Sequence, residues 1–157
     1  MNTIKNYAMV MLGLVFAIQI ASAQNYKAPA IDASGKFTDK GGKMMGKMTK
    51  DGMMDDKGIK VAHVDSEGNL VDSKSGKKLG KVEKNGNFTY HYMETSDSKN
   101  FTIGPPAQGV CEVTDDKGNV VLLVHENYKA QAACAYHCAK MKKEGKDMKM
   151  KEGHMAH

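Results

Sequence analysis

Short apolar runs alternate with glycine-containing polar turns over residues 35–93. The turn glycines recur at nearly even spacing, at Gly35, Gly52, Gly68 and Gly86. Glycine beside Asp, Asn or Ser supplies the positive φ angle that tight hairpin turns require, so each unit is predicted to form short antiparallel strands. One such unit buries too little apolar surface to be stable alone. The pattern therefore predicts a β-hairpin repeat region in which each unit packs on its neighbours.

A second apolar pattern follows over residues 94–125. A polar loop leads to a terminal hairpin, whose strands are predicted at residues 110–113 and 120–124. The unbroken apolar run of the second strand indicates that both of its faces are buried. This hairpin is therefore predicted to be central to the core.

The C-terminal part of the chain has a helical pattern. Residues 126–143 are rich in alanine and lysine and lack proline and glycine, which predicts a helix. Asn127 is the predicted N-cap, and Gly145 marks the predicted stop. Residues 144–157 contain almost no core-forming side chain except methionine, so they are predicted to be a disordered Lys/Met/His tail.

These elements predict a mainly β protein of the α+β class. Its architecture is an antiparallel meander of short hairpin repeats, followed by one C-terminal helix and a disordered tail. Residues 24–34, which precede the first repeat, are predicted to be an N-terminal linker.

The first 23 residues have the three parts of a cleavable secretory signal peptide. Lys5 precedes an apolar run over residues 8–18, and small residues lead up to Ala23. The run is shorter than the roughly 20 residues that a membrane-spanning helix needs. We predict cleavage after Ala23, no transmembrane anchor after cleavage, and a periplasmic or secreted protein.

Charge and composition exclude some functions. The formal net charge is +5, and all 23 basic residues are lysine. The planar arginine side chain that binds phosphate or guanine through two hydrogen bonds is therefore missing, and nucleic acid is excluded as a partner. The sequence contains no recognisable catalytic triad, phosphate loop or zinc-protease motif, so the protein is predicted not to be an enzyme.

The glycine-turn units and the C-terminal ending resemble those of a known class of proteins. In this ending, residues 124–129 lead from a hairpin into the helical motif Cys134-Ala-Tyr-His-Cys138. Together they resemble small exported glycine-turn β-repeat proteins of Gram-negative bacteria, which have no established activity. The resemblance implies an exported repeat protein and implies no chemistry.

Four side chains of the predicted helix could bind a metal ion. At about 100° per residue, one stripe of the helix carries Cys134, His137, Cys138 and Met141. Thiolate, imidazole and thioether groups suit copper or zinc. The tail adds further candidate ligands, at Met148, Met150, His154, Met155 and His157. The pattern predicts a soft-metal site on the helix and tail.

The cysteines have two other interpretations. A stripe of alanine, cysteine and methionine is also typical of a helix packed on a sheet, where thiols are buried and free. Export favours disulfides, and the preferred pair is Cys111 of the terminal hairpin with Cys134 or Cys138, because a bond within the helix would be strained. Metal ligation, a disulfide and buried thiols therefore all remain open.

Two other groups of residues are predicted to be structural. Methionines at positions 44, 45, 48, 53 and 54 are expected to fill gaps in the core. Aspartates also stand beside glycine turns without the spacing of a calcium loop, so they are predicted to form turns; they are Asp55, Asp56, Asp65, Asp115 and Asp116.

The leading functional hypothesis is a non-enzymatic exported protein that binds a copper-like ion through its Cys/His/Met helix and tail. The alternative is a structural or interaction module of the cell envelope. In that case a disulfide would hold the helix, and the partner would be another envelope protein or a glycan.

Overall fold

The computed structural model describes the backbone of residues 28–93 and 95–154, and the side chains of these residues up to Gly145. The predicted signal peptide, residues 1–23, lies outside the described residues. In chain order, the strands are β1 (Ala30–Ile31), β2 (Lys36–Thr38), β3 (Met44–Thr49), β4 (Gly52–Asp55), β5 (Lys60–Val64), β6 (Asn69–Asp72), β7 (Lys78–Val82), β8 (Phe88–His91), β9 (Ser98–Ile103), β10 (Val110–Thr114) and β11 (Val120–His125). The 3₁₀ helix η2 (Glu126–Gln131) and the α-helix α2 (Ala132–His154) follow.

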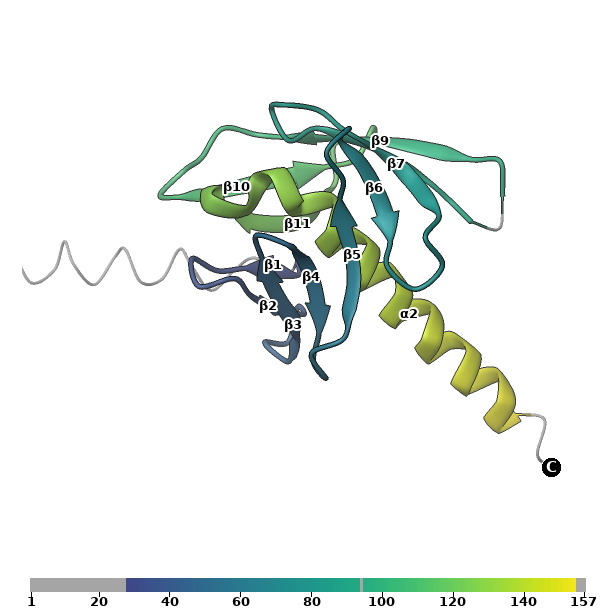
Figure 1. Cartoon of the computed structure of the whole chain (residues 1–157). Coiled ribbons are helices and arrows are strands. Elements are labelled where there is room, and N and C mark those ends of the chain that lie inside the picture. The colour runs from purple at the N-terminus through teal and green to yellow at the C-terminus, as the bar shows by residue number, and fades with distance from the viewer. Residues whose placement is uncertain (1–27, 94, 155–157) are drawn as a thin grey trace, which may run out of the picture.

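The strands form a closed barrel (Figure 1). From β2 to β11, each strand pairs antiparallel with the next strand along the chain. The short strand β1 closes the barrel, because it pairs antiparallel with β2 and parallel with β11. The predicted mainly β fold with one C-terminal helix is confirmed, but the predicted antiparallel meander is not a simple open one, because its strands close into a barrel. The closing strand lies in the predicted linker, and a pairing of two residues leaves no visible hydrophobic pattern.

Five hairpin turns use the same aspartate hydrogen bonds. In each turn, Oδ1 of the aspartate accepts the backbone N–H groups two and four residues later, at 2.8–3.0 Å. The aspartates are Asp32, Asp39, Asp55, Asp65 and Asp115. A glycine with φ of 79–85° stands three residues after each of them. The predicted turn role of Asp55, Asp65 and Asp115 is confirmed. Among the described residues, the side chains of Asp56 and Asp116 accept none of these turn hydrogen bonds, and Asp56 pairs with Lys142 instead.

The helical segment differs from its prediction at both ends. It starts as η2, which is capped by His125 and not by the predicted Asn127: the Asn127 N–H donates to Nδ1 of His125 at 3.3 Å. α2 continues through Gly145 to His154, so the predicted stop at Gly145 is wrong. A glycine inside a helix costs about 1 kcal/mol relative to alanine but keeps its N–H group, so neighbouring helix-forming residues can carry the helix past it. A helical backbone is thus found over residues 144–154, where disorder was predicted.

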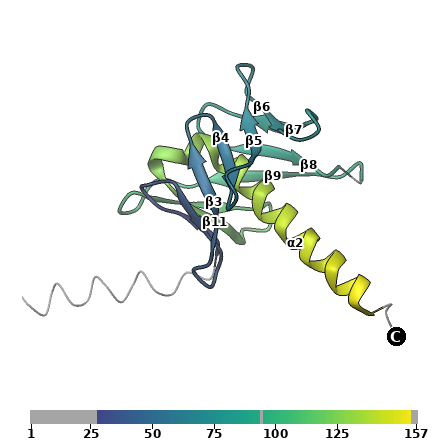
Figure 2. The same ribbon diagram turned by 60° about the horizontal axis from the view of Figure 1, so that its bottom comes forward.

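The first turns of α2 lie inside the barrel, and the helix then projects out of it (Figure 2). Ala132, Ala133, Cys134 and Ala135 are fully buried, so the helix is enclosed on every side. The helix packs against β3, β4, β5 and β11. Three of the five clustered methionines, Met45, Met48 and Met53, also belong to this core, as predicted, whereas Met44 is 45% exposed, so its predicted core role is wrong. No helix within the described residues combines the length and apolarity needed to span a membrane.

Candidate functional site

The structure separates the residues of the predicted metal stripe. Cys134, His137 and Cys138 are buried, whereas Met141 is 39% exposed. The imidazole of His137 faces β6 and β8, where it contacts Asp72 and Tyr90. Within the described residues, no three His, Cys, Asp or Glu side chains are grouped so that they could hold a metal ion. The side chains of Met148, Met150, His154, Met155 and His157 lie outside the described part, so their metal binding stays a prediction.

The three cysteines are free thiols in the core. Burial raises the pKa of Cys134 to about 12 and that of Cys138 to about 11, and it also raises the pKa of Cys111. These thiols are therefore protonated near neutral pH, which disfavours both metal ligation and oxidation. The structure shows none of the predicted disulfides, and buried free thiols are the alternative that it contains.

A series of buried polar contacts links α2 to the barrel wall. The hydroxyl of Tyr90 is 2.7 Å from Nδ1 of His137, and Nε2 of His137 is 3.5 Å from Oδ1 of Asp72. The other carboxylate oxygen of Asp72 accepts the N–H and the hydroxyl of Ser75. Burial lowers the pKa of His137, and the nearby Asp72 carboxylate only partly opposes this effect. His137 is fully buried and Tyr90 is 2% exposed, so these polar contacts hold the helix inside the barrel.

Aromatic rings extend this contact toward the surface. The Tyr136 ring packs against Phe101, Tyr90 and Phe88, with centroids 4.4, 5.1 and 6.0 Å apart. Its hydroxyl is 3.2 Å from that of Tyr92. The aromatic cluster therefore connects the buried part of α2 to Tyr92, at the place where the helix leaves the barrel.

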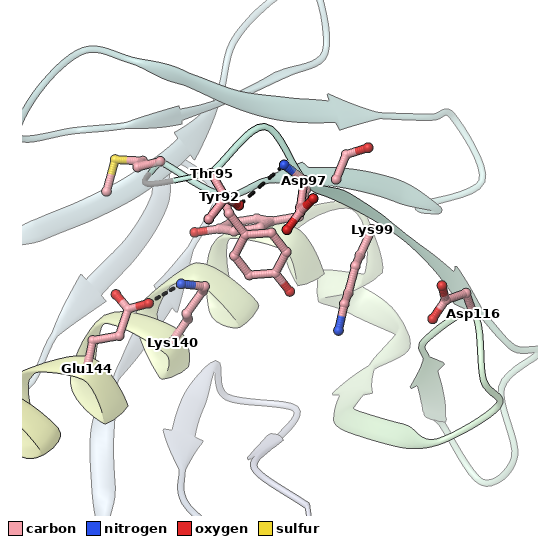
Figure 3. A pocket seen from close by; sticks show the side chains of 10 residues that line it. Tyr92, Thr95, Asp97, Lys99, Asp116, Lys140 and Glu144 are labelled. Atoms are coloured by element: carbon pink, nitrogen blue, oxygen red, sulfur yellow. Dashed lines mark hydrogen bonds and ion pairs between the residues drawn. The ribbon is translucent and has the colours of Figure 1, made fainter.

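Two adjoining hollows flank α2 at this exit, and together they form what we call the mouth groove. The polar lobe has a volume of about 590 Å³ and lies between α2 and the β8–β9 hairpin (Figure 3). The basic lobe has a volume of about 820 Å³ and lies between α2 and segments of β3 and β11. Tyr92, Lys140 and Glu144 line both lobes.

The shared wall of the two lobes is held by charged contacts. Nζ of Lys140 lies 4.7 Å from the centre of the Tyr92 ring and is paired with Glu144. Nζ of Lys99 lies 6.0 Å from the same ring, and Figure 3 shows these two lysines on its opposite sides. Cations over an aromatic face are stabilised by its negative potential. The wall is therefore held by contacts from both β9, through Lys99, and α2, through Lys140.

The basic lobe combines an apolar floor with a cationic rim. Its apolar lining residues, which we call the floor, are Met44, Met45, Val120, Val121, Tyr136 and Ala139. Four of its lining lysines, which we call the rim, are Lys40, Lys43, Lys142 and Lys143. Lys142 pairs with Asp56 at 2.8 Å. Among the described side chains, no ion pair involves Lys40, Lys43 or Lys143.

Comparisons with known protein families, with curated proteins and with solved structures found no match for this chain.

The mouth groove was not predicted from the sequence. Its residues come from the segment before β1, the β2–β3 turn, β3, the β8–β9 hairpin, the β10–β11 turn, β11 and α2, most of which are far apart along the chain. In the sequence, the lysines near Lys140 fit the negative end of a helix dipole equally well. The one sequence feature that could have indicated the groove is a lysine next to an apolar residue, as at Lys43 and Met44.

Proposed function

We propose that this protein is a non-enzymatic binding protein that holds a small amphipathic ligand in the basic lobe of the mouth groove. The supporting observation is an accessible hollow of about 820 Å³ with an apolar floor and a polar rim. Small-molecule sites are typically concave, mostly apolar and roughly 300–1,000 Å³ in volume, with a few polar groups that orient the ligand.

The fold supports this role because the floor of the lobe is attached to the core. Met45 is only 8% exposed, and Tyr136 belongs to the aromatic cluster beside the buried Tyr90–His137 contact. A floor held in this way changes little on binding, so less free energy is lost in ordering it. His137, Cys134 and Cys138 are buried in the core, so a ligand in the lobe does not reach these three side chains.

The proposal develops the interaction-module alternative and does not need a disulfide. Export, predicted from residues 1–23, stays a prediction. The soft-metal hypothesis now depends on the tail residues. Of the predicted ligands on the helix, Cys134, His137 and Cys138 are buried in the core, and only Met141 is exposed.

Binding of the neutral fluorescent dye Nile red tests the proposed function. Val120 is 38% exposed and Ala139 is partly buried, and both line the basic lobe. Val120→Trp and Ala139→Trp should each fill the lobe and weaken dye binding by about tenfold, a loss of about 1.4 kcal/mol. Ile59→Trp is the matched control, because Ile59 is 61% exposed and lies outside the groove.

Circular dichroism should show that all three variants keep their fold. The proposed function is wrong if the wild-type protein does not bind the dye, or if the folded Val120→Trp and Ala139→Trp variants bind it as the wild type does.

A further inference from the structure

We infer that the ligand of the basic lobe is an anionic amphiphile, a single apolar chain that ends in a carboxylate or similar acidic group. This inference rests on the proposed function and adds the chemical class of the ligand. It follows from the lysines and the apolar side chains that line the same lobe.

The charges of the basic lobe favour an anion. Five lysines and two acidic residues line it. Both acidic residues are already engaged: Glu144 pairs with Lys140, and Oδ1 of Asp39 accepts the N–H groups of Gly41 and Lys43 in its turn. The rim therefore presents a cationic surface to a ligand, and a cationic ligand would be repelled.

Three lysines of the rim make no ion pair with any other described side chain. Lys40, Lys43 and Lys143 are exposed, and no ion pair among the described side chains engages them. Two of them stand on the β2–β3 turn and the third on α2, on either side of the lobe. A carboxylate at the rim can thus be approached by lysines from both sides, and each such contact is a charge-assisted hydrogen bond.

The apolar floor gives the ligand its second property. Met44 is 45% exposed and Met45 is 8% exposed, so this neighbouring pair runs from the surface into the core. Val120, Val121 and Ala139 continue the floor. An apolar chain laid on these side chains would cover surface that is now partly in contact with water, which favours binding.

The polar lobe does not have this combination. Its lining mixes the lysines Lys99 and Lys140 with Asp97, Asp116 and Glu144, so neither charge sign dominates. The class of ligand inferred here therefore belongs to the basic lobe alone.

Displacement of bound Nile red by three chains of equal length tests the inference. Dodecanoate, dodecanol and dodecyltrimethylammonium are compared below their micelle-forming concentrations at neutral pH and low salt. Dodecanoate should bind about tenfold more tightly than either other compound, and its advantage should decrease as salt is added.

Substitution of these three rim lysines provides the second arm. The triple variant Lys40→Gln, Lys43→Gln, Lys143→Gln should lose the preference for dodecanoate and keep its affinity for dodecanol and Nile red. The matched control is Lys50→Gln, Lys74→Gln, Lys117→Gln, which removes the same charge from exposed positions outside the lobe. This control should behave like the wild-type protein.

The outcomes separate the inference from the proposed function. If dodecanol or dodecyltrimethylammonium displaces the dye as well as dodecanoate does, the ligand class is wrong and the binding function stands. Equal loss of the preference in both triple variants would also overturn the inference, because the effect would then come from net charge. Absence of dye binding would remove the binding function itself.

Discussion

The hydroxyl of Tyr90 on β8 lies 2.7 Å from Nδ1 of His137 on α2, inside a closed barrel. The two residues are 47 positions apart in the sequence, and their contact joins the helix to the wall that surrounds it. Because both side chains are buried, this hydrogen bond has no water to replace it.

Removal of the Tyr90 hydroxyl should destabilise the protein. In Tyr90→Phe, Nδ1 of His137 loses its partner while still buried, which should lower the free energy of unfolding by about 1–3 kcal/mol. Urea denaturation followed by circular dichroism measures this change. Tyr128→Phe is the control, because the Tyr128 hydroxyl makes no hydrogen bond among the described residues, and this variant should unfold like the wild type. Equal stability of both variants would show that the Tyr90–His137 bond contributes nothing.

Stability should decrease as the pH falls below the ordinary pKa of histidine. Burial lowers the pKa of His137 from 6.5, so below that pH the unfolded chain binds a proton more readily than the folded protein does. The contribution is complete above pH 6.5 and is lost as the pH falls toward the lowered pKa.

Urea denaturation from about pH 7 to about pH 5 should show this loss in the wild type and a smaller one in His137→Gln. Protonation of Asp72 affects the stability only at lower pH. Burial raises the pKa of its carboxyl group, but hydrogen bonds from Ser75 and the adjacent His137 bring this pKa below 3.8. If the stability of the wild type and that of His137→Gln changed equally from about pH 7 to about pH 5, the loss of stability could not be assigned to His137.

The three thiols should be present and unreactive in the folded protein. Burial keeps Cys134 and Cys138 protonated, so a thiol reagent such as Ellman's reagent should label them slowly in buffer and rapidly in denaturant. Mass spectrometry before and after reduction should show no difference in mass. A disulfide between Cys111 and a helix cysteine would instead appear as a mass increase on reduction, and it would restore the predicted pairing.

Copper binding, which stays a sequence-based prediction, should depend on the tail. Anaerobic titration with Cu(I) should show weaker binding when Met148, Met150 and Met155 are changed to Leu and His154 and His157 to Gln. Cys134→Ala with Cys138→Ala should bind like the wild type, since these thiols are enclosed. If the cysteine variant lost the binding and the tail variant kept it, the ligands would be those of the originally predicted helix stripe.

Two glycines should respond oppositely to alanine. A Cβ atom at Gly80 would stand 1.8 Å from the carbonyl oxygen of Thr89, where β7 pairs with β8. Gly80→Ala should therefore force the strands apart and lower the unfolding free energy by about 1–3 kcal/mol or more. A Cβ atom at Gly145 meets no described heavy atom outside its own turn of helix within 4 Å, so Gly145→Ala should increase helicity and leave the fold intact. Thermal unfolding followed by circular dichroism measures both, and a Gly80→Ala protein as stable as the wild type would contradict the close approach.

Local signals explain why much of the fold was predictable. An aspartate turn is made by hydrogen bonds between residues two and four positions apart, so its chemistry is visible in a short stretch of sequence. Consecutive antiparallel strands follow from such turns. The helix was likewise visible from its alanine and lysine content, although its cap and its end were not, because a favourable neighbourhood outweighed Gly145.

The candidate site was not predictable in the same way. When a helix lies on one side of a sheet, the residues on one of its faces share one environment, and the metal stripe was predicted on that basis. Inside a barrel every face of the helix meets a wall, and neighbouring positions face different strands. His137 is therefore held by Asp72 and Tyr90, and the lysines of α2 meet those of the β2–β3 turn at the exit.

The sequence by itself determined the hairpin turns, the strands between them and the C-terminal helix, because these depend on residues close together in the chain. Only the tertiary structure decided that β1 closes the barrel, that the Cys/His segment becomes core, and that a lysine-rimmed groove forms where α2 emerges. Each of these features depends on contacts between distant segments, whose free energy is not encoded in any local pattern.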